Sequence, residues 1–233
     1  MLYDFFLNHK FAGSVTAPLF RLGLRARSWC FAFRNAVGMA THFVRRNGPV
    51  DRDKVRRILV IRTDRIGDIV LSTPALRALR AHFPRAGIDY LVQTNHAPLL
   101  GCYEGWDNLV TVDDVHDTAS VRRIGRELAR GGYDVAVVGH PSSYGYKLAW
   151  WSKAPVRVGW NAKGYGYTLT HALDDDRTVV DMHQVENNIR VLRPLGVVDA
   201  APKFPTRTTP RGEALGGRLE ATLGRLWELW SAR

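Results

Sequence analysis

Cysteine is almost absent from this chain, because only Cys30 and Cys102 occur among its 233 residues. The two lie far apart and form no Cys-x-x-Cys pair, so the sequence supports neither a disulfide framework nor a thiolate metal site. We therefore expect a protein of the reducing cytosol. Long hydrophobic runs are missing as well: no apolar stretch approaches the ~18 residues of a membrane-spanning helix, and Asp4 and Lys10 interrupt the region where a signal peptide needs apolar residues. We expect no export signal.

Glycine-rich phosphate-binding fingerprints are also missing from the loop after the first predicted strand. That loop has neither the glycines of G-x-G-x-x-G nor the Gly-Lys-Ser/Thr ending of a P-loop, which disfavours a dinucleotide dehydrogenase. Acidic residues are too few to balance the basic ones, and the formal net charge is +11 with a pI near 10.1. This charge predicts an anionic partner: nucleic acid, phospholipid headgroups or a phosphorylated substrate. Nucleic acid is the weakest of the three, because no nucleic-acid-binding motif accompanies the basic residues.

Residues 1–50 differ from the rest of the chain. They contain seven of the nine phenylalanines, and seven Lys or Arg against the single acid Asp4. On a helical wheel, apolar side chains share one broad face and arginines flank it; the apolar residues are Leu22, Ala26, Trp29, Phe33, Ala36, Val37, Ala40, Phe43 and Val44, and the arginines are Arg21, Arg25, Arg27, Arg34 and Arg45. A helix packed on the protein's own core would show a similar face. We predict instead a helical extension that lies on the inner face of the cytoplasmic membrane.

After a linker at residues 47–54 the pattern changes to short β-rich runs that alternate with helical periodicity. The runs cover residues 57–62, 88–93, 108–112, 134–139 and 156–160. Between them, Ile69, Leu76, Leu79 and Phe83 share one helix face, and further helices are expected around 121–128 and 185–195, the latter closed by Gly196. Continuous strands separated by helices predict a doubly wound α/β domain with a parallel sheet over residues 55–200.

The stretch RTDRIGDIVLSTPAL, residues 62–76, directly follows the first predicted strand. Ligands of parallel sheets bind beyond the carboxyl ends of the strands, so this loop is the first candidate for a site. Gly67 lets the backbone turn tightly or approach a ligand closely. Two interpretations of Asp68 stay open at this point. It is either a helix N-cap, with Pro74 starting a second helical segment or kinking the first, or a catalytic carboxylate.

The segment ILVIRTDRIGDIVLSTPALRALRAHFP resembles the opening of the ADP-heptose:lipopolysaccharide heptosyltransferase family, glycosyltransferase family 9, with its Gly-Asp pair, Thr-Pro-x-Leu helix and closing Pro. Further similar pieces follow in order at 133–139, 154–160 and 183–196, the last resembling the family's His-x-Val-Glu helix. The resemblance covers about 57–196. It implies a Rossmann-like N-terminal half of a GT-B fold and an inverting transfer of heptose from ADP-heptose to the lipopolysaccharide inner core.

The resemblance implies that Asp68, in the Gly-Asp pair, is the general base. Inversion by direct displacement needs one base within about 3 Å of the acceptor hydroxyl proton. Arg62 and Arg65 carry guanidinium groups suited to acceptor carboxylates or phosphates. In the Gly- and Tyr-rich loop at 161–169, Lys163 or Tyr165 is a further acceptor contact unless the loop is only a connector. We predict substrate-binding roles for Arg62, Thr63, Asp64, Arg65, Gly67, Thr73 and Lys163.

Two other polar motifs are interpreted structurally. The run Asp174 to Asp176 predicts a solvated turn rather than metal-binding carboxylates. His183 and Glu186 predict helix capping, since two ligands make no metal site. We predict no metal and no cofactor, because the nucleotide sugar is a substrate.

The resemblance also implies a second doubly wound domain that binds the nucleotide sugar. Residues 201–233 predict only a Pro-rich connector and a short helix through Leu215, Leu219, Leu223 and Leu226. Because a departing diphosphate needs preorganised donors or cations, we expect a truncated transferase or one completed by a second chain that supplies the donor-binding domain. The alternative is a non-catalytic membrane module that binds anionic lipid. The expected partners are a lipopolysaccharide precursor or similar anionic glycolipid and the cytoplasmic membrane surface.

Overall fold

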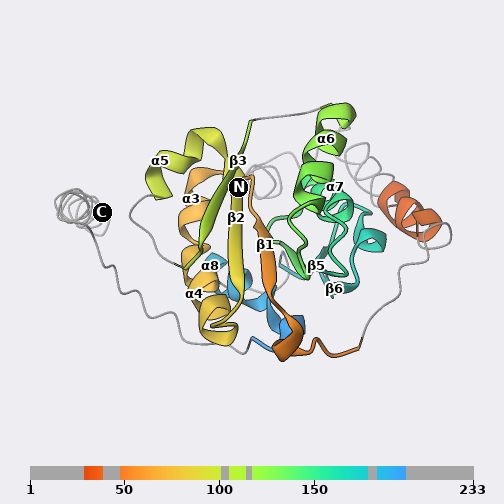
Figure 1. Cartoon of the computed structure of the whole chain (residues 1–233). Helices are drawn as coiled ribbons and strands as arrows, with labels where there is room; N and C mark the ends of the chain where they lie inside the picture. The colour runs from red at the N-terminus through yellow and green to blue at the C-terminus, as the bar shows by residue number, and fades with distance from the viewer. Residues whose placement is uncertain (1–28, 39–47, 101–104, 114–116, 178–182, 198–233) are drawn as a thin grey trace, which may run out of the picture.

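The computed structural model describes residues 29–38, 48–100, 105–113, 117–177 and 183–197. Within them, parallel strands form one six-stranded sheet in the order β3-β2-β1-β4-β5-β6 (Figure 1). The strands are β1 (Arg57–Ile61), β2 (Gly87–Gln93), β3 (Asn108–Val112), β4 (Val135–Val138), β5 (Val156–Asn161) and β6 (His171–Asp174). The predicted doubly wound α/β fold is confirmed. The strand order reverses at β1, where Ile61 is level with Leu91 of β2 and Val138 of β4.

Helices cover both faces of the sheet (Figure 1). One face carries α4 (Thr73–His82) and α8 (Gln184–Arg190), and the other carries α6 (Thr118–Ala129) and α7 (Ser143–Trp151). The shorter helical segments are α3 (Ile66–Val70), α5 (Ala97–Leu100), η1 (Arg52–Lys54), η2 (Thr94–His96), η3 (Gly166–Thr168) and η4 (Arg193–Leu195). None of the helices in the described part of the chain has the length and apolarity to cross a membrane.

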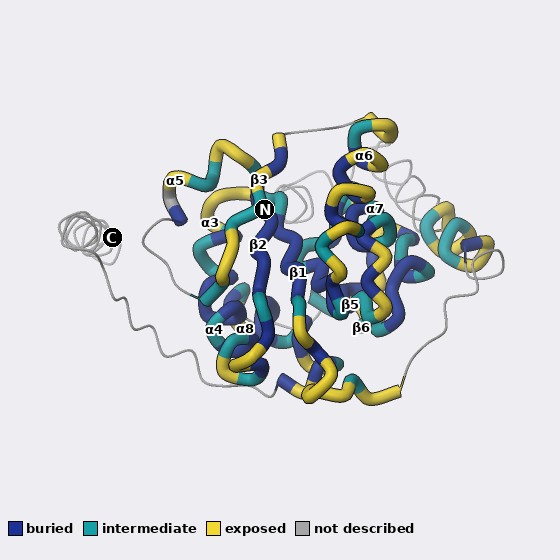
Figure 2. The backbone as a smooth tube through the Cα atoms, in the orientation of Figure 1, coloured by how far each residue is buried: buried dark blue, intermediate teal, exposed yellow. Residues whose placement is uncertain are grey.

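The side chains of β1 divide between two hydrophobic cores. Ile58 and Val60 join the core beneath α4 and α8, whereas Leu59 and Ile61 join the core beneath α6 and α7. All four are buried, and Figure 2 shows the burial following the strands through the middle of the molecule. A strand covered on both faces needs apolar residues at successive positions. This explains why the sequence of β1 is a continuous apolar run rather than an alternating one.

Several elements differ from the sequence prediction. The pattern misses β6, an edge strand whose side chains are half-buried or exposed, and Asp174 is its last residue rather than part of a turn. It also misses α7, whose sequence SYGYKLAWW combines a glycine with four aromatic residues. The helix expected over 185–195 ends at Arg190 and is followed by η4. Gly196 then closes η4 with a left-handed φ of 81°, as predicted for a C-cap.

Residues 29–38 are helical and pack on the segment after β5. The Asn35 Oδ1 accepts a hydrogen bond from the Tyr167 amide at 2.8 Å, and the Arg34 guanidinium lies 4.0 Å from the Tyr165 ring centroid. The helical wheel predicts that Arg34 reaches outward beside the apolar face. In the structure, Arg34 instead contacts the protein's own Tyr165. Trp29 and Phe33 point outward and are 77% and 72% exposed. Residues 1–28 and 39–47 of the predicted extension, and residues 201–233, lie outside the described residues.

Candidate functional site

The carboxyl ends of three neighbouring strands meet around an open hollow of about 530 Å³. The segment after β1 contributes Thr63, Asp64, Arg65 and Asp68 to its lining; Gln93 and His96 come from the end of β2, and His140 follows β4. The strand order reverses here, and open α/β sheets bind ligands at such a reversal. The structure therefore places the loop singled out from the sequence at the expected site.

Asp68 lies in the first turn of α3 and is half-buried. The N-cap position of α3 belongs to Arg65, whose side chain makes no capping hydrogen bond. The interpretation of Asp68 as the N-cap is therefore wrong. Pro74 occupies the first turn of α4, so it starts a second helix after the turn at Leu71 and Ser72. The carboxylate of Asp68 remains part of the hollow's lining, close to the positive end of the α3 dipole.

Asp64 is a carboxylate enclosed by the protein, with a side chain only 7% exposed. Arg62 Nε lies 2.9 Å from its Oδ1 and His140 Nδ1 lies 3.4 Å from its Oδ2. The angles of both contacts fall outside strict hydrogen-bond geometry, and the Arg62 contact is a close buried ion pair. Burial raises the pKa of Asp64; the Arg62 charge opposes this and the Asp68 carboxylate adds to it. Asp64 thus keeps lone pairs for a ligand that donates hydrogen bonds.

His140 is a half-buried imidazole in the same lining. Burial lowers the pKa of His140 to about 4; the positive charges of Arg62, Lys163 and Arg177 act in the same direction, and Asp68 opposes them. The ring is therefore neutral at pH 7, and one of its nitrogens can accept a hydrogen bond while the other donates one. The sequence analysis missed this residue. The available signal is its place directly beyond the apolar run 134–139, at the carboxyl end of a strand.

Arg62 lies behind the hollow rather than in it. The residue is 1% exposed, and its NH1 group donates to the Gly139 carbonyl at 2.8 Å and to Asn188 Oδ1 at 2.9 Å. Direct contact of Arg62 with an acceptor does not fit this burial, so we correct its predicted role to positioning. Arg65 is exposed and lines the hollow. The structure therefore separates two arginines that the sequence analysis grouped.

Thr73 is likewise turned inward. It is 8% exposed, and its hydroxyl donates to the Val70 carbonyl at 2.8 Å, which closes the turn between α3 and α4. A substrate-binding role for Thr73 does not fit this geometry. Gly67 is exposed in α3, and a Cβ built on it meets no atom within 4 Å. Its predicted contact with a ligand stays a prediction.

The segment after β5 separates Lys163 from Tyr165. Lys163 is exposed, has a left-handed φ of 53°, and carries a charge that acts on His140. Tyr165 stacks on the buried Tyr146 with ring centroids 5.5 Å apart and does not line the hollow. Lys163 is not among the lining residues either, but its charge reaches His140, so its contact with the acceptor stays a prediction.

The two motifs interpreted structurally have local partners. His183 is the N-cap of α8, and its Nδ1 accepts a hydrogen bond from the Val185 amide at 3.2 Å, which confirms the capping prediction for His183; for Glu186 it stays a prediction. Asp176 pairs with Arg190 at 2.7 Å. In the described ranges of the chain, no three His, Cys, Asp or Glu side chains are arranged to hold a metal ion.

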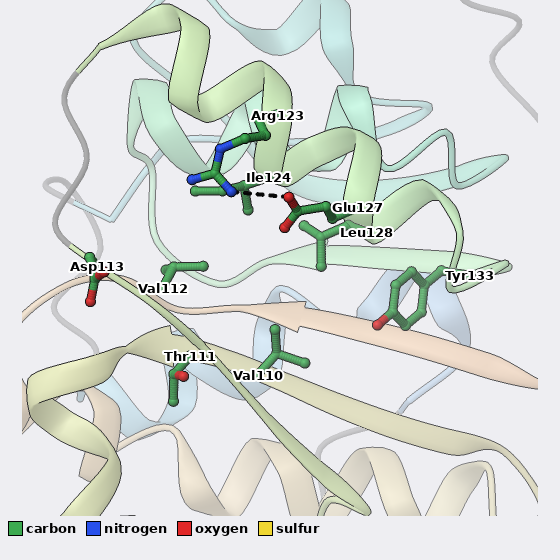
Figure 3. A pocket seen from close by; sticks show the side chains of 9 residues that line it. All are labelled: Val110, Thr111, Val112, Asp113, Arg123, Ile124, Glu127, Leu128 and Tyr133. Atoms are coloured by element: carbon green, nitrogen blue, oxygen red, sulfur yellow. Dashed lines mark hydrogen bonds and ion pairs between the residues drawn. The ribbon is translucent and has the colours of Figure 1, made fainter.

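A second hollow of about 410 Å³ lies between β3 and α6 (Figure 3). Its polar side chains are already paired within the protein: Arg123 with Glu127 at 3.0 Å, Asp113 with the Thr94 hydroxyl at 2.9 Å, and the Tyr133 hydroxyl with Asp89 at 2.6 Å. The remaining lining is largely aliphatic. The hollow at the strand ends is therefore the better candidate for chemistry.

Comparison with known proteins confirms the resemblance seen in the sequence. Lipopolysaccharide heptosyltransferase 2 of Salmonella typhimurium is 27% identical over 156 residues, which are 64% of this chain and 43% of that protein. The enzyme of the same name from Escherichia coli is 27% identical over 157 residues. The chain spans about two fifths of the length of these curated relatives. No family model matches it.

Solved structures give the same answer for the fold. A glycosyltransferase family 9 protein from Veillonella parvula matches with a TM-score of 0.60 and 25% identity, over 72% of this chain and 49% of that one. Escherichia coli ADP-heptose lipopolysaccharide heptosyltransferase II matches with a TM-score of 0.57 and 22% identity, over 68% and 49% of the two chains. The described domain therefore has the α/β architecture found in about half of each of these proteins.

Proposed function

We propose that this chain, similar to heptosyltransferases over about two thirds of its length, provides the acceptor side of an inverting glycosyltransferase. In this proposal a heptose passes from ADP-heptose to the inner core of lipopolysaccharide, and Asp68 is the general base. The observation that carries the proposal is the gathering of Asp68, Asp64 and His140 in one hollow at the reversal of strand order.

The proposed reaction is one displacement at the sugar's anomeric carbon. The Asp68 carboxylate takes the proton of an acceptor hydroxyl while the hydroxyl oxygen forms a bond to that carbon. The bond from the carbon to the phosphate oxygen breaks, and ADP leaves with the electron pair, so the configuration inverts. Asp64 orients the acceptor by accepting a hydrogen bond, and Arg65 neutralises an acceptor carboxylate or phosphate. The proposed step includes no metal and no cofactor.

The departing ADP needs stabilisation from outside the hollow. Arg65 is the one guanidinium among the described lining residues, and a diphosphate leaving group needs more cations or N–H donors than that. We therefore propose that a donor-binding domain, supplied by a second chain, completes the site. Lys163, whose charge acts on His140, is proposed to contact an anionic group of the acceptor.

The acceptor in this proposal is an anionic glycolipid, which places the protein on the inner face of the cytoplasmic membrane. Two aromatic side chains support this location: Trp29 and Phe33 are one helical turn apart and strongly exposed. They belong to the segment 1–50, which carries seven basic residues and one acid. Aromatic rings beside basic groups are typical of helices that lie in an anionic membrane interface.

The test is acceptor-dependent release of ADP from ADP-heptose, measured with the full chain, purified together with the proteins that bind it in its own cells, and an inner-core lipopolysaccharide acceptor. Asp68→Asn keeps the shape of the side chain and removes the base, so we expect a loss of about 100-fold or more in rate. Glu186→Gln, at an exposed position outside the hollow, is the matched control and should leave the rate unchanged.

Two outcomes contradict the proposal in different ways. ADP release that survives Asp68→Asn removes Asp68 from the role of base. Acceptor binding with no ADP release at saturating donor, when the proteins that bind this chain are present in the assay, favours the alternative, a non-catalytic module that binds anionic lipid or a lipopolysaccharide precursor at the membrane.

A further inference from the structure

The helix α8 reaches the candidate site through one buried side chain. Asn188 is 3% exposed, and its amide faces the segment between β1 and α4. Its Oδ1 accepts a hydrogen bond from Arg62 NH1 at 2.9 Å, and its Nδ2 donates to the Leu71 carbonyl at 2.9 Å. Because Arg62 only donates and the Leu71 carbonyl only accepts, these neighbours fix the orientation of the amide.

Asn188 Oδ1 also accepts a hydrogen bond from Gln184 of the same helix at 3.1 Å, and its other two partners stand at opposite ends of one segment. Arg62 is the residue directly after β1, and Leu71 is the C-cap of α3. Every hollow-lining residue from this part of the chain lies between them: Thr63, Asp64, Arg65 and Asp68. A single amide therefore fixes both the entry and the exit of the segment that carries the two carboxylates.

The hydrogen bond between Asn188 and Arg62 also fixes where the Arg62 guanidinium lies relative to Asp64. NH1 of Arg62 is held by Asn188 and by the Gly139 carbonyl, and Nε then lies 2.9 Å from Asp64 Oδ1. A buried guanidinium held by two acceptors on one nitrogen has little freedom to rotate. The position of the positive charge beside Asp64 is thereby set from α8.

The hydrogen bond from Asn188 to the Leu71 carbonyl holds the C-terminal end of α3, which is only five residues long. A helix of this length is not stable by itself and depends on tertiary contacts. Its few backbone bonds include Ile69 N–H to the Arg65 carbonyl at 3.1 Å and Leu71 N–H to the Gly67 carbonyl at 3.0 Å. The amide of Asn188 adds a side-chain anchor at the end where these bonds stop.

We propose that Asn188 is a positioning residue of the site: it clamps both ends of residues 62–71 and so holds Asp64 and Asp68 in place. This gives a function to the sequence HQVENNIR, which belongs to a helix outside the hollow. His183 starts the helix, and Asn188 carries its contact to the site. The consequence for catalysis rests on the proposed function, whereas the clamp itself does not.

Amide hydrogen exchange on the full chain tests the clamp without reference to activity. We expect Asn188→Leu to speed exchange at Ile69, Leu71 and Ser72 by roughly tenfold relative to the amides of β4, because α3 then opens locally. Asn188→Asp, which keeps the acceptor for Arg62 but loses the donor for Leu71, should speed the same amides. It provides the answer if the leucine variant does not fold.

The matched control is Ile189→Ala, a buried large-to-small change on the same helix that removes no hydrogen bond to residues 62–71. It should lower the thermal midpoint without a selective change at residues 69–72. If both Asn188 variants behave like this control, the clamp is overturned. A third outcome is that the Asn188 variants exchange faster at residues 69–72 but release ADP with an unchanged kcat. The clamp then exists but does not position the reacting groups. Selectively faster exchange supports the clamp even if no ADP is released with the proteins that bind this chain present; that outcome contradicts the proposed function alone.

Discussion

Asp64 and Asp89 are both buried aspartates, and their hydrogen bonds differ. Asp89 accepts hydrogen bonds from Arg57 at 2.8 Å, from the Tyr133 hydroxyl at 2.6 Å and from Asn108 at 2.8 Å. Asp64 has one close charged partner, the Arg62 guanidinium at 2.9 Å, and its second oxygen has only the His140 ring at 3.4 Å. A buried carboxylate with three donors belongs to the framework, whereas one with unused lone pairs is available to a ligand.

Asp89→Asn is predicted to destabilise the fold without touching the hollow. An amide cannot accept all three hydrogen bonds, and it leaves the Arg57 charge without its counter-ion. We expect the free energy of unfolding in urea to fall by about 2–3 kcal/mol. Asp113→Asn, at an exposed carboxylate, should change it by less than about 0.5 kcal/mol. Equal effects of the two variants would contradict the framework role of Asp89.

His140 predicts a defined pH dependence of stability. The pKa of His140 is about 4 in the folded protein against 6.5 for an unperturbed histidine, because burial and nearby positive charges disfavour the imidazolium. Between these values the unfolded state binds more protons, so this contribution to stability is complete above pH 6.5 and is lost as the pH falls toward 4. We expect the urea midpoint of His140→Gln to fall less between pH 7 and pH 4.5 than that of the unchanged chain. Parallel falls would show that the imidazole is not held neutral.

At the level of the elements, we expect glycine-to-alanine substitutions in two helices to change the free energy of unfolding in opposite directions. Gly125 of α6 packs so closely on α7 that an added Cβ overlaps Trp151. We expect Gly125→Ala to lower the free energy of unfolding by about 1–3 kcal/mol. Gly67 of α3 faces open space, so Gly67→Ala should raise it by about 0.5–1 kcal/mol through helix propensity.

Thermal or urea unfolding of both variants checks these signs. If Gly67→Ala stabilises the fold and also weakens acceptor binding, the glycine serves close approach of a ligand, as its place in the candidate site suggests. Stabilisation with unchanged acceptor binding would contradict the predicted substrate-binding role of Gly67.

The elements show where sequence reasoning succeeds. The five predicted strands are present because each contains an apolar or β-branched run that local sequence reveals; β1, β2 and β4 are also buried on both faces. β6 was missed because this edge strand of four residues has no such run. α7 was missed because its glycine and four aromatic residues give no helical pattern of their own; they fit the surface on which the helix packs. Its Gly145, for example, lies against Val138 of β4.

The site shows the same limit. Asp64, Arg65 and Asp68 were found because they follow one strand directly. His140 and Asn188 were missed because the topology, not the local sequence, brings them there; Asn188 is 126 positions along the chain from Arg62. The burial of Arg62 and Thr73 was also invisible, since the sequence does not show which polar residues point inward.

For the whole molecule, the N-terminal helical residues predict binding to anionic bilayers. We expect Trp29→Ser combined with Phe33→Ser to weaken binding to vesicles containing anionic lipid by about tenfold or more, through loss of inserted aromatic area. Both residues are strongly exposed, so the thermal midpoint should stay the same. Co-sedimentation with vesicles measures this, and Lys153→Ser, at an exposed site, is the control. Unchanged binding of the double variant would contradict the membrane prediction.

The central place of β1 also determines the order in which the molecule is assembled on the ribosome. β1, β2 and β3 are consecutive in the chain and adjacent in the sheet, so this half pairs while later residues are still being synthesised. The second edge of β1 pairs only after β4 has been synthesised. Arg62 forms its hydrogen bond to Asn188 later still, once Asn188 has left the ribosome. We therefore expect the nascent chain to acquire its sheet before its site, with the buried guanidinium exposed to water until the last described helix docks.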